Sequence, residues 1–172
     1  PGLWNVSLQN RFFYDSRTTS LDDLIKEVLS NGQEMNTSST NAMQTVLRQP
    51  DYQQILQNAY PGSSQEQAGE KMVNAIGMYI HSLLSYQSRF DAYMRNPSDQ
   101  LTGSEKRGFN LFMGKGRCGS CHFAPFFNGT KPPLYLYQES EVLGVPEAKN
   151  RKRPKIDPDS GRIKSTGRNF HL

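Results

Sequence analysis

Two cysteines and a histidine stand close together at residues 118–122, which read Cys-Gly-Ser-Cys-His. Two thiols three positions apart on one helical turn can form thioether bonds to the two vinyl groups of a haem. The residue that follows then brings a neutral imidazole nitrogen under the iron as an axial ligand. This spacing is the attachment motif of a c-type haem, so the sequence predicts a haem held covalently by Cys118 and Cys121 and ligated by His122.

Two other kinds of site use a C-x-x-C pair. A structural zinc site needs a second pair of cysteine or histidine ligands, and the chain has no further cysteine. A thioredoxin-like redox disulfide is expected beside a βαβ pattern, which the sequence does not show. Haem attachment therefore fits the sequence best.

The composition indicates a water-soluble chain with much loop. Its 172 residues suffice for an ordinary core, and the mean hydropathy is −0.71. We expect no membrane span, because the most apolar run, 75–84, is short and contains His81. The chain opens on Pro1 without a signal peptide. Because haems of this kind are attached outside the cytoplasm, we expect a periplasmic or otherwise extracytoplasmic protein, present here as a mature chain or a piece of one.

Charge is distributed unevenly along the chain. Residues 1–98 carry a net charge of −2, and residues 99–172, which include the haem motif, carry +6. A basic surface could attract an acidic partner protein, although a solvated basic surface explains the charge equally well. Nucleic acid is not an expected partner, because the basic residues are not interleaved with stacking aromatic side chains.

The apolar spacing predicts helices throughout the first two thirds of the chain. One helix follows a Ser20–Asp23 cap and ends at Asn31-Gly32 in a left-handed cap. A shorter helix is predicted from Thr40 to Pro50, and a long one from Ser63 to about Arg95. A fourth helix, capped at 102–105, leads to the haem motif. A boundary near 96–100 divides the chain into a helical lobe, 1–97, and a haem lobe, 98–172.

Helical patterns end after Phe123. The segment 157–161 reads Asp-Pro-Asp-Ser-Gly, which resembles the start of a calcium loop, but Arg168 stands where a bidentate glutamate is expected. An Asx turn is therefore predicted. The basic run 149–155 is predicted to be a solvated loop or a docking surface.

The order of three sequence blocks resembles the bacterial di-haem cytochrome c peroxidases and their relatives that mature a tryptophan-derived quinone cofactor. The first block is 3–8 with Phe-Tyr-Asp-Ser-Arg at 13–17, the second is Glu34-Met35, and the third is 101–112 before the haem motif. The resemblance covers nearly the whole chain. It implies an all-α fold, with a cytochrome c-like haem domain preceded by a helical lobe of the peroxidatic haem domain.

The resemblance also implies an enzyme and the roles of its residues. Hydrogen peroxide would be reduced to water with electrons from a small donor protein, a cytochrome c or a cupredoxin. His122 would be the proximal ligand of the electron-accepting haem, and Tyr14, in place of the usual inter-haem tryptophan, an electron relay. Glu34 matches the acid/base carboxylate, which moves a proton between the peroxide oxygens. On the residues alone, Glu34 reads as an exposed carboxylate and Tyr14 as a core aromatic.

Some family features are replaced in this chain or are expected outside it. Ser16 stands in place of the usual glycine, and Leu24 where many members have glutamine. The motif of the other haem c should precede Pro1, so the chain is expected to be an interior piece. The usual sixth ligand, a methionine after Met113, is not present. Candidates within the chain are His171, Tyr135 and Tyr137, but a ligand from outside it is expected.

Three functions stay open from the sequence. The favoured one is a di-haem peroxidase, with a calcium ion between the lobes and a homodimer allowed by the resemblance. The alternative is an electron-transfer c-type cytochrome domain without peroxidase chemistry. A third is the oxidation of a protein side chain, as in the quinone-maturation branch of the family.

Overall fold

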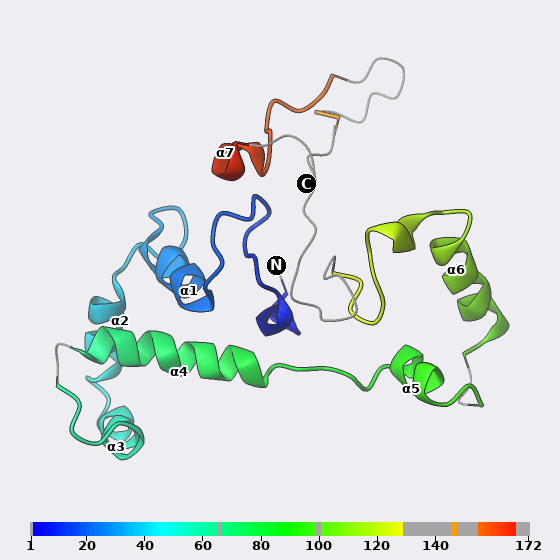
Figure 1. Ribbon diagram of the computed structural model, residues 1–172. Coiled ribbons are helices and arrows are strands. Elements are labelled where there is room, and N and C mark those ends of the chain that lie inside the picture. Colours follow the sequence, from blue (N-terminus) through cyan, green and yellow to red (C-terminus); the bar gives the residue numbers. More distant parts are fainter. Residues whose placement is uncertain (1, 65–66, 99–100, 129–145, 148–154, 168–172) are drawn as a thin grey trace. The chain divides into compact units, whose positions relative to one another are not determined.

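The computed structural model describes residues 2–64, 67–98, 101–128, 146–147 and 155–167. Within these ranges the chain forms helices joined by turns, with an isolated antiparallel bridge between Pro146 and Ile156 and no strand (Figure 1). The predicted all-α fold is confirmed. Most of the basic run 149–155 lies outside the described residues, as do the three candidate sixth ligands, Tyr135, Tyr137 and His171.

Contacts divide the chain into two compact units, which are described separately below. Unit 1 consists of Pro1–Ser7 and Thr18–Leu83, and unit 2 of Leu8–Arg17 and Leu84–Leu172. The lobes 1–97 and 98–172 stay a prediction. The contacts place the segments 8–17 and 84–97 in the same unit as the haem motif.

The first helices of the chain begin where a serine can cap them. After the short 3-10 helix η1 (Val6–Leu8), α1 (Leu21–Ser30) begins as predicted, with Ser20 Oγ accepting the Asp23 N–H at 3.2 Å. The next helix, α2 (Ser39–Val46), is capped by Ser38 and not by Thr40. The left-handed cap predicted for α1 is wrong, because Asn31 is extended with φ −64°.

Two helix boundaries in unit 1 differ from the prediction. Pro50, expected only to end a helix, is the first residue of α3 (Pro50–Ala59), where its missing N–H leaves no hydrogen bond unmade. The long helix is shorter than expected, because α4 spans Ala68–Ser82 and ends with Leu83 as its C-cap. The predicted start at Ser63 is wrong, and α4 has no side-chain cap at Gln67.

Unit 1 has a hydrophobic core of its own, in which α1 and α2 pack against α4. Burial of one such side chain contributes about 1.5–3 kcal/mol. Gly69 allows α2 to approach closely, because a Cβ there would lie only 2.9 Å from the Thr40 backbone nitrogen. The buried members of this core are Ile25, Leu29, Met43, Ala68, Met72, Val73 and Ile80.

Unit 2 contains α5 (Arg89–Arg95), α6 (Gly103–Met113), the 3-10 helix η3 (Cys118–Ser120) and α7 (Ile163–Thr166). The predicted capping box of α6 is confirmed, with Thr102 and Glu105 bonded reciprocally. Hydrogen bonds from the Thr102 backbone and side chain lower the pKa of Glu105. The start of α5 at a second capping box, Ser88 with Asp91, was not predicted.

Aromatic rings connect the helices of unit 2. Phe90 of α5 lies 5.1 Å from Phe109 of α6 and 5.4 Å from Phe127, centroid to centroid, and Phe112 lies 5.6 Å from Phe127. Neither α5 nor α6 buries a residue completely. Among the described residues of this unit, Phe12 and Leu101 are the buried large apolar side chains. Among the described residues, unit 2 therefore buries fewer apolar side chains than unit 1 does.

Candidate functional site

The haem motif follows α6 through a tight turn. Gly116 N–H donates to the Leu111 carbonyl at 2.7 Å, and Arg117 adopts a left-handed conformation with φ 54°. The 3-10 turn then closes with a hydrogen bond of 2.9 Å from the His122 N–H to the Cys118 carbonyl. Both cysteines are free and exposed. The turn thus presents two thiols to solvent.

The imidazole of His122 is held by a backbone carbonyl. Its Nδ1 lies 2.9 Å from the Phe127 carbonyl oxygen, which a turn positions through the hydrogen bond from the Phe127 N–H to the Phe123 carbonyl at 2.7 Å. A carbonyl oxygen can only accept, so Nδ1 is the donor of this bond, and Nε2 is the nitrogen through which a neutral imidazole would bind iron. This is the tautomer and the orienting bond that an iron ligand requires.

The residues beside the motif fit a haem. Gly119 is buried, and a Cβ there would meet Met113 Cε at 2.8 Å, so the motif packs closely on the end of α6. The Phe112 ring lies 6.3 Å from the His122 ring. Leu111 is 56% exposed and Met113 44% exposed. Two thiols, a free imidazole nitrogen and an exposed apolar rim are the donors and the surface that a covalently bound macrocycle needs.

Basic side chains lie on α6 and on the turn between that helix and the haem motif. Lys106, Arg107, Lys115 and Arg117 are all exposed. Lys106 Nζ lies 5.2 Å from the centre of the Tyr93 ring of α5. The Glu105 carboxylate of the same helix forms an ion pair with the Arg89 guanidinium, with 3.0 Å between nitrogen and oxygen. The segment 103–117, which leads into the haem motif, therefore carries four basic side chains and one carboxylate.

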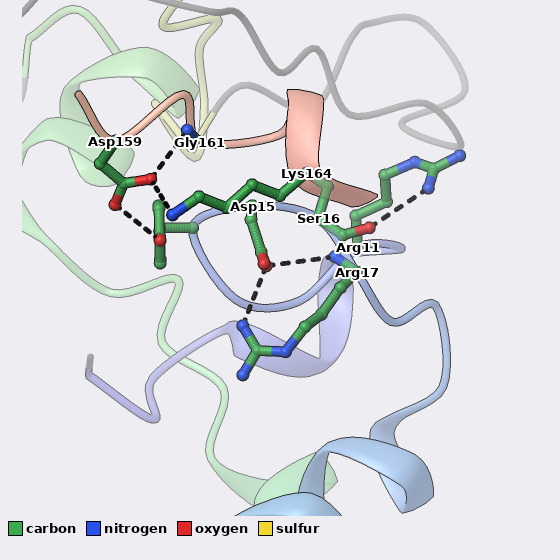
Figure 2. A network of polar contacts seen from close by, with 8 residues as sticks. Arg11, Asp15, Ser16, Arg17, Asp159, Gly161 and Lys164 are labelled. Atoms are coloured by element: carbon green, nitrogen blue, oxygen red, sulfur yellow. Dashed lines mark hydrogen bonds and ion pairs between the residues drawn. The ribbon is translucent and has the colours of Figure 1, made fainter. Parts of the chain in front are cut away.

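Tyr14 belongs to a second polar cluster of unit 2. Its hydroxyl donates to Asp159 Oδ2 at 2.8 Å, and Asp159 Oδ1 accepts from Lys164 Nζ at 2.7 Å and from Gly161 N–H at 3.1 Å. Figure 2 shows Asp159 between Lys164 and Gly161. Tyr14 itself is 69% exposed, so the interpretation of Tyr14 as a core aromatic is wrong.

These contacts shift the pKa values of Tyr14, Asp159 and Lys164. Hydrogen bonds from Lys164, Tyr14 and Gly161 lower the pKa of Asp159 to about 2. The hydrogen bond to Asp159 raises the pKa of the Tyr14 phenol, and the same carboxylate raises the pKa of Lys164. At neutral pH the cluster is therefore a neutral phenol, a carboxylate and an ammonium group.

Glu34 lies in unit 1, in the turn after α1. Its N–H donates to the Asn31 carbonyl at 3.0 Å, and Thr37 N–H closes the turn on the Leu29 carbonyl at 2.8 Å. The side chains of Glu34 and Met35 are exposed. Glu34 therefore belongs to unit 1, whereas Tyr14 and the haem motif belong to unit 2. Its catalytic role stays a prediction.

The predicted Asx turn is confirmed. Asp157 Oδ1 accepts the Asp159 N–H at 2.8 Å, and Asp159 Oδ1 accepts the Gly161 N–H. Among the described residues, no three side chains of histidine, cysteine, aspartate or glutamate are grouped as a metal site, and the calcium ion stays a prediction. The described helices are also too short or too polar to cross a membrane.

The family model for di-haem cytochrome c peroxidase matches residues 1–99. The chain belongs to this family. Cytochrome c551 peroxidase of Nitrosomonas europaea is 28% identical over 167 residues, which cover 97% of this chain and 46% of that protein. The chain thus spans about half the length of the curated relatives it matches, or less. Resemblance to the di-haem peroxidases, inferred from the three sequence blocks, is confirmed.

Two solved structures share the family fold. The crystal structure of a MauG-like protein associated with microbial copper homeostasis has a TM-score of 0.75 at 21% identity, over 97% of this chain and 50% of that one. The di-haem peroxidase BthA from Burkholderia thailandensis has a TM-score of 0.55 at 26% identity, over 94% of this chain and 38% of BthA. The haem c of this family is the cofactor that the Cys118–His122 motif fits.

Sequence reasoning missed two parts of the site. The Phe127 carbonyl that orients His122 lies on an irregular turn and has no side-chain signature. Asp159 was identified only as a turn residue, and its bond to Tyr14 spans 145 positions. The start of α5 did have a signature, because Ser88-x-x-Asp91 is a capping-box pattern.

Proposed function

We propose that the chain is part of a di-haem cytochrome c peroxidase that reduces hydrogen peroxide to water. Electrons would enter through a haem c held by this chain. The observation that carries the proposal is the family match over residues 1–99, ahead of a haem motif whose histidine is already oriented. A simple electron carrier has no need of some hundred residues before its haem.

The chain's own residues divide the work. Cys118 and Cys121 would bind the haem covalently, and His122 Nε2 would ligate its iron while the Phe127 carbonyl fixes the ring. When bound, the haem supplies an iron centre that exchanges single electrons. Glu34 would move a proton between the two peroxide oxygens, and Tyr14 would relay electrons. The sequence blocks around these two residues support both roles.

The remaining partners follow from charge and from the family. The exposed cations beside the haem motif favour an acidic electron donor, a small cytochrome c or cupredoxin, by long-range attraction. A second haem c is expected in the complete protein. A periplasmic location follows from covalent haem attachment. The proposal also includes a calcium ion bound between the lobes and the assembly of the protein as a homodimer.

The alternative is an electron-transfer domain without peroxidase chemistry, which the haem motif alone would equally support. The two are separated by supplying the complete, pre-reduced protein with donor and following the disappearance of hydrogen peroxide. Steady consumption, with two haems per chain by the pyridine haemochrome spectrum, is expected. The Cys118→Ser, Cys121→Ser double variant should retain one haem and stop accepting electrons from the donor. A two-haem protein that never consumes peroxide would instead be a carrier.

A further inference from the structure

The hydrogen bond between Tyr14 and Asp159 raises a question about how Tyr14 could relay electrons. A phenol that loses one electron becomes a strong acid, and the oxidation is easier when its proton passes to a base in the same step. The rate of the step therefore depends on a base at hydrogen-bond distance. Asp159 Oδ2 lies 2.8 Å from the Tyr14 hydroxyl oxygen, and both residues belong to unit 2.

The segment that carries Tyr14 is held by its neighbours. Arg17 pairs with Asp15 at 3.0 Å, and its guanidinium carbon lies 3.4 Å from the centre of the Phe13 ring. Asp15 and Ser16 are buried, at 8% and 6% exposure. The Arg11 guanidinium donates to the Ser16 carbonyl at 3.5 Å. Figure 2 shows the contacts of Arg17 with Asp15 and of Arg11 with Ser16 beside the Asp159 cluster. The backbone on both sides of the exposed phenol is therefore fixed.

Asp159, the hydrogen-bond partner of the phenol, is also held by its neighbours. Its own N–H is bonded to Asp157, and its Oδ1 is occupied by Gly161 N–H and Lys164. The second oxygen, Oδ2, faces the phenol. The carboxylate thus offers Tyr14 one oriented, negatively charged acceptor.

We propose that Asp159 is the proton acceptor for the one-electron oxidation of Tyr14, which makes this tyrosine a proton-coupled relay; the inference rests on the relay role proposed above. The electron leaves Tyr14 for a one-electron oxidant, which is reduced, and the phenolic proton crosses to Asp159 Oδ2. The product pair is a neutral tyrosyl radical and a carboxylic acid. When an electron returns, the proton moves back and the cluster is restored.

Lys164 limits this transfer. Its ammonium group, 2.7 Å from Asp159, stabilises the carboxylate and so makes it a weaker base. Removing that charge should strengthen the base and speed the oxidation of Tyr14. Asp159→Asn has the opposite effect, because the amide oxygen can still accept the hydrogen bond but cannot take the proton.

The test oxidises the complete, haem-loaded protein with a photogenerated ruthenium(III) tris-bipyridine complex. Fluorotyrosine incorporated only at position 14 identifies the radical, since the fluorine nucleus splits its electron paramagnetic resonance signal. The appearance of this signal is followed in H2O and in D2O. Variants are accepted when their haem content and circular dichroism match those of the parent.

The split signal is expected to grow more slowly in D2O than in H2O. Asp159→Asn should slow its growth and remove the acceleration that Lys164→Met produces in the parent. Unchanged rates and isotope effect in Asp159→Asn, or no split signal in the parent, would overturn the inference. Peroxide consumption by Tyr14→Phe separately tests the relay: unchanged consumption in that variant would refute the proposed relay itself, whatever Asp159 does.

Discussion

Ser16 occupies a backbone conformation that ordinarily favours glycine. Its φ is 61° and its side chain is buried at 6% exposure. A left-handed conformation costs a residue with a Cβ about 1–2 kcal/mol. The resemblance described above implies a glycine at this position, and the positive φ is a physical reason for one. The serine of this chain therefore retains a backbone strain that a glycine would avoid.

Replacing Ser16 by glycine should stabilise the protein. We expect Ser16→Gly to raise the free energy of unfolding by up to about 1 kcal/mol, because the strain is relieved and only partly offset by the greater freedom of glycine in the unfolded chain. Urea unfolding measures the change. Ser16→Ala is the matched control, since it keeps the Cβ and should bring no gain. If both variants raise the free energy of unfolding, the stabilisation comes from removal of the hydroxyl group and not from relief of backbone strain.

Glu34 provides the sharpest test of peroxide chemistry at a single residue. Glu34→Gln keeps the shape of the side chain but removes its titratable proton, so peroxide turnover by the complete protein should fall about 10²–10⁴-fold. Haem content and electron uptake at the His122 haem should stay the same. Glu70→Gln, an exposed carboxylate of α4 in the same unit, should leave turnover unchanged. Equal turnover in both variants would remove Glu34 from the mechanism.

At the level of residues, the sequence indicated the site where chemistry has a fixed local spacing. Cys118, Cys121 and His122 are recognisable because thioether attachment needs them within one turn. The turn at Asp157 is recognisable for a similar reason, since an Asx turn closes over two residues. The contact between Tyr14 and Asp159 depends on how distant segments pack, and no local pattern encodes it.

Helix ends were predictable where a side chain forms the cap. Ser20 and Thr102 both accept the backbone N–H three residues on, and both helices begin where the sequence predicted. The start of α4 has no side-chain cap and was misplaced. The break after Ser82 interrupts an apolar pattern that continues beyond it, so periodicity alone extended the helix too far.

Two glycines of α4 should respond oppositely to alanine. At Gly69 a Cβ would lie 2.9 Å from the Thr40 nitrogen, whereas at Gly77 the nearest atom, Asp22 Oδ1, is 3.4 Å away. Gly69→Ala must push α2 aside and should cost about 1–3 kcal/mol. Gly77→Ala gains helix propensity, up to about 1 kcal/mol. Thermal or urea unfolding measures both variants. A stable Gly69→Ala variant would mean that α2 shifts freely on α4.

On the scale of the whole molecule, the two units differ in what holds them together. Unit 1 has seven buried core side chains of its own, while α5 and α6 of unit 2 bury none. The Cys118→Ser, Cys121→Ser double variant of the complete protein should therefore lose amide-exchange protection in α5 and α6. Protection in α1 and α4 should persist. Loss of protection in all four helices together would show that the units fold as one.

The path of the chain between the units limits how the protein can be divided. The segment 8–17 belongs to unit 2, yet unit 1 residues stand on both sides of it. It contains Phe12, Asp15 and Ser16, which are buried. A fragment that starts at Leu84 would therefore lack the segment 8–17 and its buried side chains. The complementary fragment, 1–83, would contain that segment without the rest of unit 2. No single cleavage of the backbone separates the two units, so a truncation or a recombination that divides the chain at one point should remove part of at least one of them.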